Sequence, residues 1–118
     1  MRIEVKGRNT PVTEDLNDHV IKRFRKIGRQ VSELAVLEIE ITEERNPSNP
    51  ESWVAEGTLY LKGCTLRAKD ASRDLEHSVN MMADELARQV KRHRDKRRAR
   101  RVKRTAPGSA PDLGAPAT

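Results

Sequence analysis

The amino-acid sequence predicts an α+β fold, a two-layer β-α-β-β-β-α sandwich in which two helices cover one face of a four-stranded sheet. Four segments alternate between apolar and polar residues, which is the pattern of strands that are buried on one face. In two further segments the apolar residues recur every three or four positions, as they do along one side of a helix. The chain has 118 residues, a length typical of one domain with one core.

The first strand is predicted at residues 1–7, where Ile3 and Val5 share one face. Thr13 then provides an oxygen that can cap a helix, and the two acids that follow it suit the positive end of the helix dipole. The apolar stripe of this helix has five members: Leu16, Val20, Phe24, Ile27 and Val31. Four basic residues lie away from the stripe: Lys22, Arg25, Lys26 and Arg29. We therefore expect a first helix that is apolar toward the sheet and basic toward solvent.

The second strand is predicted at residues 34–42, where apolar side chains alternate mainly with glutamates. Pro47 and Pro50 cannot continue a hydrogen-bonded ladder, so residues 43–51 are predicted to form an exposed loop.

Residues 53–61 and 64–69 are predicted to form a hairpin with the two-residue turn Lys62-Gly63. This turn would place Glu56 opposite Lys69 on the outer face. On the inner face it would set three pairs: Leu61 with Cys64, Leu59 with Leu66, and Gly57 with Ala68.

The second helix is predicted from the apolar stripe Ala71, Leu75, Val79, Met82, Leu86 and Val90. It meets no Gly or Pro before Pro107, so we expect it to continue into the basic run at residues 91–104. Residues 1–98 are thus predicted to be the folded domain and residues 99–104 a basic extension of its second helix. Residues 105–118 are rich in Ala, Pro and Gly and are predicted to be a disordered tail.

The positive charge is concentrated in one segment. The chain carries 24 Lys and Arg against 18 Asp and Glu, a net charge of +6. Residues 91–104 hold 10 basic residues and one acid, whereas residues 1–90 hold 14 basic and 16 acidic residues. Such clustering is typical of a protein that binds a polyanion. Because aromatic residues make up only 3% of the chain, phosphate contacts are favoured over rows of rings that stack on single-stranded bases.

Other kinds of site are not predicted. His19, His77 and His93 are far apart and are interpreted as surface residues, so no metal site is expected. Cys64 has no evident activating partner and is predicted to be a buried structural thiol. Without a Gly-rich phosphate loop or a serine elbow, neither enzyme activity nor a cofactor is expected. The single cysteine and the lack of a targeting or membrane-spanning segment favour the cytoplasm.

Several short motifs follow one another along the chain, and their order and spacing together are informative. They are Gly7-Arg8-Asn9, Thr13 at the start of the first helix, Leu66-Arg67-Ala68, Asp74-Leu75, and Leu86-Ala87-Arg88-Gln89-Val90-Lys91-Arg92. In these motifs, over residues 1–98, the chain resembles the short form of the ribosome hibernation promoting factor family. That family is also called the protein Y, ribosome-associated inhibitor or sigma-54 modulation protein family. Where the family usually has Asp-Met-Tyr-Ala-Ala-Ile-Asp, this chain has a different sequence: Asp74-Leu75-Glu76-His77-Ser78-Val79-Asn80.

The resemblance implies a domain related in shape to double-stranded RNA-binding domains. It also implies a place in the small ribosomal subunit where messenger and transfer RNA would pass. The family's basic helix positions fall on Arg23, Lys26, Arg88, Lys91 and Arg92, with Arg8 after the first strand. Together with their basic neighbours, the candidate rRNA-binding residues are Arg8, Lys22, Arg23, Arg25, Lys26, Arg29, Arg88, Lys91, Arg92 and Lys96.

These observations support the hypothesis of a stress or stationary-phase translation inhibitor that binds the small subunit and its rRNA. It would be a monomer when free and would need no membrane and no small-molecule substrate. Long family members carry a further dimerising domain that this sequence lacks, so we do not expect the chain to pair ribosomes by itself. Two alternatives stay open: a general double-stranded RNA-binding protein or RNA chaperone, and a protein-interaction modulator of transcription.

Overall fold

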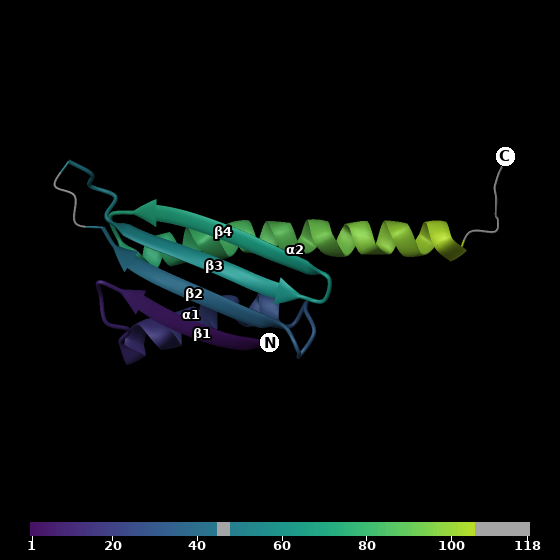
Figure 1. Ribbon diagram of the computed structural model, residues 1–118, viewed down its shortest axis with the longest axis horizontal. Coiled ribbons are helices and arrows are strands. Elements are labelled where there is room, and N and C mark those ends of the chain that lie inside the picture. The colour runs from purple at the N-terminus through teal and green to yellow at the C-terminus, as the bar shows by residue number, and fades with distance from the viewer. Residues whose placement is uncertain (45–47, 106–118) are drawn as a thin grey trace.

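The computed structural model describes residues 1–44 and 48–105, with side-chain positions up to residue 99. Its elements follow one another in the predicted order: β1 (Arg2–Arg8), α1 (Glu14–Gly28), β2 (Val36–Glu43), β3 (Trp53–Leu61), β4 (Cys64–Ser72) and α2 (Leu75–Thr105). Both helices lie on the same face of the four-stranded sheet (Figure 1). The predicted α+β sandwich is therefore confirmed. We call the opposite face of the sheet the open face.

The four strands lie in chain order across the sheet, β1-β2-β3-β4. β1 pairs with β2 in parallel, whereas the other two pairs are antiparallel. The parallel pair is possible because α1 carries the chain back along the sheet between β1 and β2. Side chains of β2 that face the helices form the centre of the core, because Leu37, Ile39 and Ile41 are all almost completely buried.

α1 begins where the sequence predicts. The Thr13 hydroxyl accepts a hydrogen bond of 3.1 Å from the backbone N–H of Leu16, which satisfies one free donor of the first turn. Four members of the predicted stripe are buried: Leu16, Val20, Phe24 and Ile27. The fifth, Val31, lies beyond the end of the helix at Gly28 and packs half-buried against the core.

β2 begins later than predicted. Residues 34–42 were expected to form the strand, but it spans Val36–Glu43, and Leu34 is 89% exposed in the turn before it. The backbone N–H of Leu34 donates a hydrogen bond of 3.1 Å to the Ser32 hydroxyl. Such a local bond offers the backbone an alternative to the sheet ladder and keeps Leu34 out of the strand.

The β3–β4 hairpin has the predicted register, with all three inner pairs and the Glu56–Lys69 pair in place. In the turn Gly63 has a φ of 75°, whereas Lys62 does not have a positive φ. A lysine is therefore acceptable at the first position, because this turn needs a left-handed residue only at the second. Glu56 forms its ion pair diagonally with Arg67, at 4.0 Å. Cys64 faces the helices as predicted, but it is half-buried and not buried.

α2 also begins later than predicted, because β4 continues through Ala71 to Ser72, which pairs with Trp53. The backbone N–H of Asp74 then donates a hydrogen bond of 3.2 Å to the Ser72 hydroxyl, and this turn separates the strand from the helix. Ala71 is therefore a strand residue and not the first member of the helical stripe.

The buried stripe of α2 packs on β3 and β4 and ends at Val90. At the closest approach, a Cβ atom on Gly57 would lie 2.6 Å from the Sδ atom of Met82. A glycine there lets the helix lie directly on the sheet. The C-terminal part of the helix extends past the sheet (Figure 1). Neither described helix contains a stretch long and apolar enough to cross a membrane.

α2 is continuous across the predicted boundary between residues 98 and 99. The division into a folded domain and a basic extension therefore stays a prediction. Thr105, predicted to be the first residue of the tail, is the last residue of the helix. A difference of one residue is within the usual variation of helix ends. The rest of the predicted disordered tail, residues 106–118, lies outside the described residues.

Candidate RNA-binding surface

A groove with a volume of about 350 Å³ lies between α1 and α2. Ala83 and Ala87 form part of its floor, and their small side chains leave room between the two helices. Five basic side chains line it: Arg23, Lys26, Arg88, Lys91 and Arg94. Because Asp84 is the only acidic residue among its described lining residues, the groove favours an anionic ligand. We call this feature the basic groove.

Helical spacing brings these residues together. Arg23 and Lys26 are three positions apart on α1, and residues three or four apart share one side of a helix. On α2 the same spacing links Ala87, Lys91 and Arg94. Four of the predicted rRNA-binding residues thus line one groove, because two buried stripes orient the helices side by side.

Arg23 is held by an acid of the neighbouring helix. Its Nη2 atom lies 2.6 Å from Oδ1 of Asp84, and both side chains are partly exposed. This ion pair crosses the basic groove from α1 to α2. The guanidinium keeps further N–H donors, since it has five in all and this bond engages one nitrogen.

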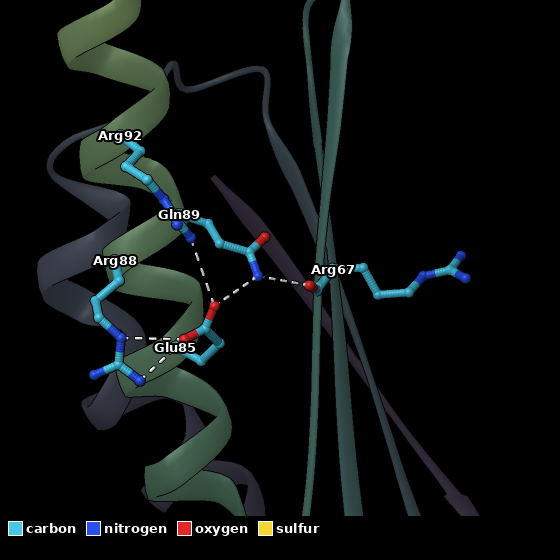
Figure 2. A network of polar contacts seen from close by, with 5 residues as sticks. All are labelled: Arg67, Glu85, Arg88, Gln89 and Arg92. Atoms are coloured by element: carbon cyan, nitrogen blue, oxygen red, sulfur yellow. Dashed lines mark hydrogen bonds and ion pairs between the residues drawn. The ribbon is translucent and has the colours of Figure 1, made fainter.

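Glu85 organises a second set of contacts, on α2 (Figure 2). One carboxylate oxygen accepts hydrogen bonds from Arg88, with Nε at 3.1 Å and Nη2 at 3.0 Å. The other accepts a bond of 3.1 Å from the Gln89 amide and lies 3.7 Å from Arg92. Gln89 also donates a bond of 2.9 Å to the backbone carbonyl of Arg67, which ties the network to β4.

The hydrogen bond from Gln89, and next the bond from Arg88, lower the pKa of Glu85 below its ordinary value. Each of these bonds favours the ionised form of the carboxyl group. Glu85 is therefore ionised at neutral pH and draws Arg88 and Arg92 toward each other. It neutralises part of their charge, but it also fixes their orientation.

Other predicted basic residues have no acidic partner among the residues that the structure describes. Within the described part of the chain, no ion pair involves six of them: Lys22, Arg25, Lys26, Arg29, Lys91 and Lys96. All six side chains are exposed. Their charge is therefore available to an anion without the loss of an ion pair seen among the described residues.

Not every predicted residue lies at the basic groove. Arg8 is at the end of β1, and its Nη1 atom lies 3.9 Å from Oε1 of Glu40. Arg92 and Lys96 line a separate hollow of about 350 Å³ together with Cys64 and Leu66 of β4. The structure thus separates these three predicted residues from the groove. Three more predicted residues are not among the residues that line it: Lys22, Arg25 and Arg29.

Arg94 lines the basic groove but is absent from the set predicted by sequence. Its Nε atom is shielded from solvent and has no hydrogen-bond partner among the described residues. A polar atom in this state gains stability from any acceptor that reaches it. The signal that points to Arg94 is its spacing of three from Lys91, which places both on the side of α2 that faces α1.

Within the described residues, no group of three or more His, Cys, Asp or Glu side chains could hold a metal ion. The histidines are not all simple surface residues. His19 of α1 is half-buried, and its Nε2 atom lies 3.1 Å from Oδ1 of Asn80 on α2. This contact helps to align the two helices that form the groove.

Comparison with known sequences shows relatives of one kind. The chain is 27% identical over 97 residues to the "Ribosome hibernation promotion factor" of Picosynechococcus sp., covering 81% of this chain and 50% of that protein. It is 25% identical over 96 residues to the "Ribosome hibernation promoting factor" of Salmonella typhimurium, covering 81% of this chain and 96% of that protein. The chain thus spans half the length of the Picosynechococcus relative and nearly all of the Salmonella relative.

Two solved structures share the fold. The N-terminal domain of Thermus thermophilus protein Y matches with a TM-score of 0.68 and 24% identity, covering 79% of this chain and 99% of that chain. A ribosomal subunit interface protein from Coxiella burnetii matches with a TM-score of 0.68 and 17% identity, covering 80% and 99%. At these identities the likeness establishes the fold alone.

A family model described as "Sigma 54 modulation protein / S30EA ribosomal protein" matches residues 3–98. Apart from Arg2 at the start of β1, this range includes β1, α1, β2, β3 and β4, together with most of α2, and it contains every candidate rRNA-binding residue. The resemblance inferred from the short motifs is thereby confirmed. The chain belongs to the Sigma 54 modulation protein / S30EA ribosomal protein family.

Proposed function

We propose that this chain is a ribosome-associated translation inhibitor, which binds rRNA of the small subunit and occupies the path of messenger and transfer RNA. One observation carries the proposal: five basic side chains from two helices line a single groove. Its family and the names of its relatives support a role at the ribosome. Bound in stationary phase or under stress, the chain would keep ribosomes inactive.

The groove would bind phosphates in two ways. Lys26 and Lys91 have no acidic partner among the described residues and would contact phosphates directly, releasing counterions from the RNA. The arginines are already oriented by carboxylates and would use their remaining N–H donors. The shielded Nε of Arg94 would gain an acceptor. In this mechanism the chain acts by filling space and needs no catalysis, cofactor or metal.

The further assignments follow from this mechanism. The ligand is rRNA in the cytoplasm, and a monomer suffices, because one chain supplies both helices of the groove. The ten predicted residues are retained as candidate contacts, with Arg94 added and with Arg8 on a different side of the molecule.

Sedimentation of the purified chain with separated ribosomal subunits tests the proposal. We expect co-migration with the small subunit and inhibition when the same ribosomes translate a reporter messenger RNA. Migration away from ribosomes would refute the proposal and favour the role in transcription. Equal binding to small subunits, large subunits and plain duplex RNA would favour a general double-stranded RNA-binding protein. The groove gives that second candidate some support, since phosphate contacts position a protein without reading sequence.

A further inference from the structure

Two consecutive acidic residues of α2 lie among the candidate rRNA-binding arginines. Asp84 pairs with Arg23 of α1 across the basic groove. Glu85 binds Arg88 through both Nε and Nη2 and lies 3.7 Å from Arg92 (Figure 2). Among the described residues, every ion pair of a candidate arginine on the two helices is made with one of these two acids. We call Asp84 and Glu85 the acidic pair.

Glu85 is itself held in place by the fold. Gln89 donates one hydrogen bond of 3.1 Å to its Oε2 atom and another of 2.9 Å to the backbone carbonyl of Arg67, on the outer strand β4. The bond from Gln89, and next the bond from Arg88, lower the pKa of Glu85, so its carboxylate stays ionised at neutral pH. The guanidinium of Arg88 is therefore oriented by a carboxylate that is anchored to the sheet.

The acidic pair weakens the attraction of this surface for anions, because each negative charge repels a phosphate that approaches its arginine. Stability of the fold is a weak reason for the arrangement. The side chain of Asp84 is 58% exposed and that of Glu85 is 35% exposed, and ion pairs in contact with solvent stabilise proteins little. A surface that needed only a high affinity for RNA would gain from neutral residues at both positions.

What the acidic pair does provide is orientation. A guanidinium has five N–H donors in a planar fork, and an arginine that is held by a carboxylate presents its remaining donors in fixed directions. A phosphate that matches these directions binds without the entropy cost of ordering a long side chain. A phosphate in any other position meets an arginine that is already paired and a carboxylate that repels it. Such a surface favours one arrangement of phosphates and disfavours the others.

We infer that the acidic pair determines the RNA specificity of this surface, by orienting Arg23, Arg88 and Arg92 toward the phosphates of one folded RNA and by lowering the affinity for RNA duplexes in general. The inference rests on the proposed function and adds to it the residues that distinguish rRNA of the small subunit from other RNA. Because Asp84 and Glu85 act through the arginines, they are positioning residues. The unpaired lysines of the basic groove supply affinity for both kinds of RNA.

The test compares two ligands of the full chain over a range of salt concentrations: purified small subunits, and a plain RNA duplex of about 16 base pairs, the length that a double-stranded RNA-binding domain spans. Asp84→Asn/Glu85→Gln removes both negative charges and hardly changes side-chain size. We expect this variant to bind the duplex more tightly than the parent does. The magnitude of its slope of log affinity against log salt should rise by about 0.7–0.9 for each arginine that now contacts a phosphate of the duplex.

The affinity for small subunits should rise less or fall, because the arginines lose their orientation. The ratio of the affinity for small subunits to the affinity for the duplex should therefore fall by about threefold or more, which is the effect of one phosphate contact between about 50 and 200 mM salt. Melting temperatures from circular dichroism verify that each variant is folded.

Two further variants separate orientation from charge. Glu4→Gln/Glu56→Gln is the matched control, because it makes the same change in net charge and breaks ion pairs with Arg2 and Arg67 on the open face of the sheet. It should leave the affinity ratio unchanged. Gln89→Met keeps the net charge but removes the bonds that anchor Glu85. It should lower the ratio by weakening the binding of small subunits, while the affinity for the duplex stays that of the parent.

An unchanged or higher ratio in Asp84→Asn/Glu85→Gln would overturn the inference. An equal fall in the open-face control would also overturn it, since net charge alone would then explain the effect. A parental ratio in Gln89→Met would do the same, because orientation of the arginines would have no influence. The proposed function fails in a different way: the parent chain itself would then show no preference for small subunits over the duplex.

Discussion

At the scale of single residues, the basic groove contains two kinds of cation. Lys26 and Lys91 have no carboxylate partner in the described part of the chain, whereas Arg23 and Arg88 each bind one. A phosphate that approaches a free lysine replaces only water. A phosphate that approaches a paired arginine must share it with an acid. The lysines therefore offer the clearer test of the groove, since their replacement breaks no ion pair among the described residues.

We predict that the double variant Lys26→Glu/Lys91→Glu loses ribosome binding and stays folded. Surface substitutions usually change the free energy of unfolding by no more than about 0.5 kcal/mol each. The melting temperature measured by circular dichroism should therefore change little, while sedimentation with the small subunit should be lost.

The matched control for these lysines is Lys6→Glu/Lys69→Glu. It makes the same change in net charge on two exposed residues of β1 and β4 that are outside the groove. If both double variants lost binding equally, the effect would come from total charge, and the groove would not be the binding surface.

A second prediction concerns Glu85, whose pKa is lowered in the folded protein by hydrogen bonds from Gln89 and Arg88. A lowered pKa means that its contribution to stability is present above the ordinary glutamate pKa and is lost as the pH falls through the folded value. The melting temperatures of the parent chain and Glu85→Gln should therefore differ most at neutral pH and converge as the pH falls through the lowered pKa of Glu85. A difference that is constant over this range would show that the charge of Glu85 is not what stabilises the network.

The sequence predicts which basic residues are exposed, because exposure follows from helical period, but it does not predict their partners. Lys22, Lys26 and Arg29 are exposed as expected. The contact between Arg23 and Asp84 joins residues 61 positions apart and depends on how α1 docks against α2. For the same reason Arg94 was missed, since only the docked helices show that it faces the groove.

At the scale of elements, the position of α2 depends on a close approach to β3. Gly57 lies under the helix, where a Cβ atom would be 2.6 Å from the sulfur of Met82 and 3.7 Å from a methyl group of Leu86. Both of these side chains are completely buried, so neither can move aside easily. The distance between α2 and the sheet also sets where Arg88 and Lys91 lie relative to α1.

We predict that Gly57→Ala lowers the free energy of unfolding by about 1–3 kcal/mol, the usual cost of overpacking a core. Chemical denaturation measures it. The control is Gly28→Ala at the end of α1, where the new Cβ would lie 3.4 Å from a flexible methionine carbon, an ordinary contact. There the substitution should stabilise by about 0.4–1 kcal/mol, because alanine restricts the unfolded chain. A neutral Gly57→Ala would mean that α2 is free to shift on the sheet.

The elements themselves are largely predictable, because alternation and helical period are local patterns. The hairpin register was predicted in full, since a two-residue turn fixes every later pair. The strand ends were not, because Leu34 is kept out of β2 by the Ser32 hydroxyl, and β4 extends to Ser72 through its pairing with Trp53. Neither contact has a periodic signal in the sequence.

At the scale of the whole molecule, folding and binding depend on different parts of α2. Its buried stripe ends at Val90, and residues 91–104 hold 10 of the 24 basic residues. We predict that a chain ending at Val90 stays folded but binds ribosomes much more weakly, because it lacks Lys91 and Arg94 of the groove. A chain that ends at Thr105 should bind like the parent. Full binding by the shorter chain would show that the basic run makes no contact with RNA.

The last prediction concerns the salt dependence of binding. Six candidate residues form no ion pair with the residues that the structure describes, and the groove arginines add to their positive charge. If about 6–10 phosphates are neutralised, affinity should fall by roughly 10³–10⁵ between about 50 and 200 mM salt, on the scale known for duplex DNA. The slope of log affinity against log salt for small subunits measures this. The magnitude of this negative slope should decrease by about 0.7–0.9 for each phosphate contact that a variant removes.

Because each phosphate contact contributes to the slope, the variants can be ranked by the magnitude of their slopes. Lys26→Gln should reduce the magnitude of the slope by the amount expected for about one phosphate contact. The chain that ends at Val90 should reduce it by the amount expected for several contacts. A slope near zero for the parent chain would mean that few phosphates are bound and that the positive charge of α2 serves another purpose.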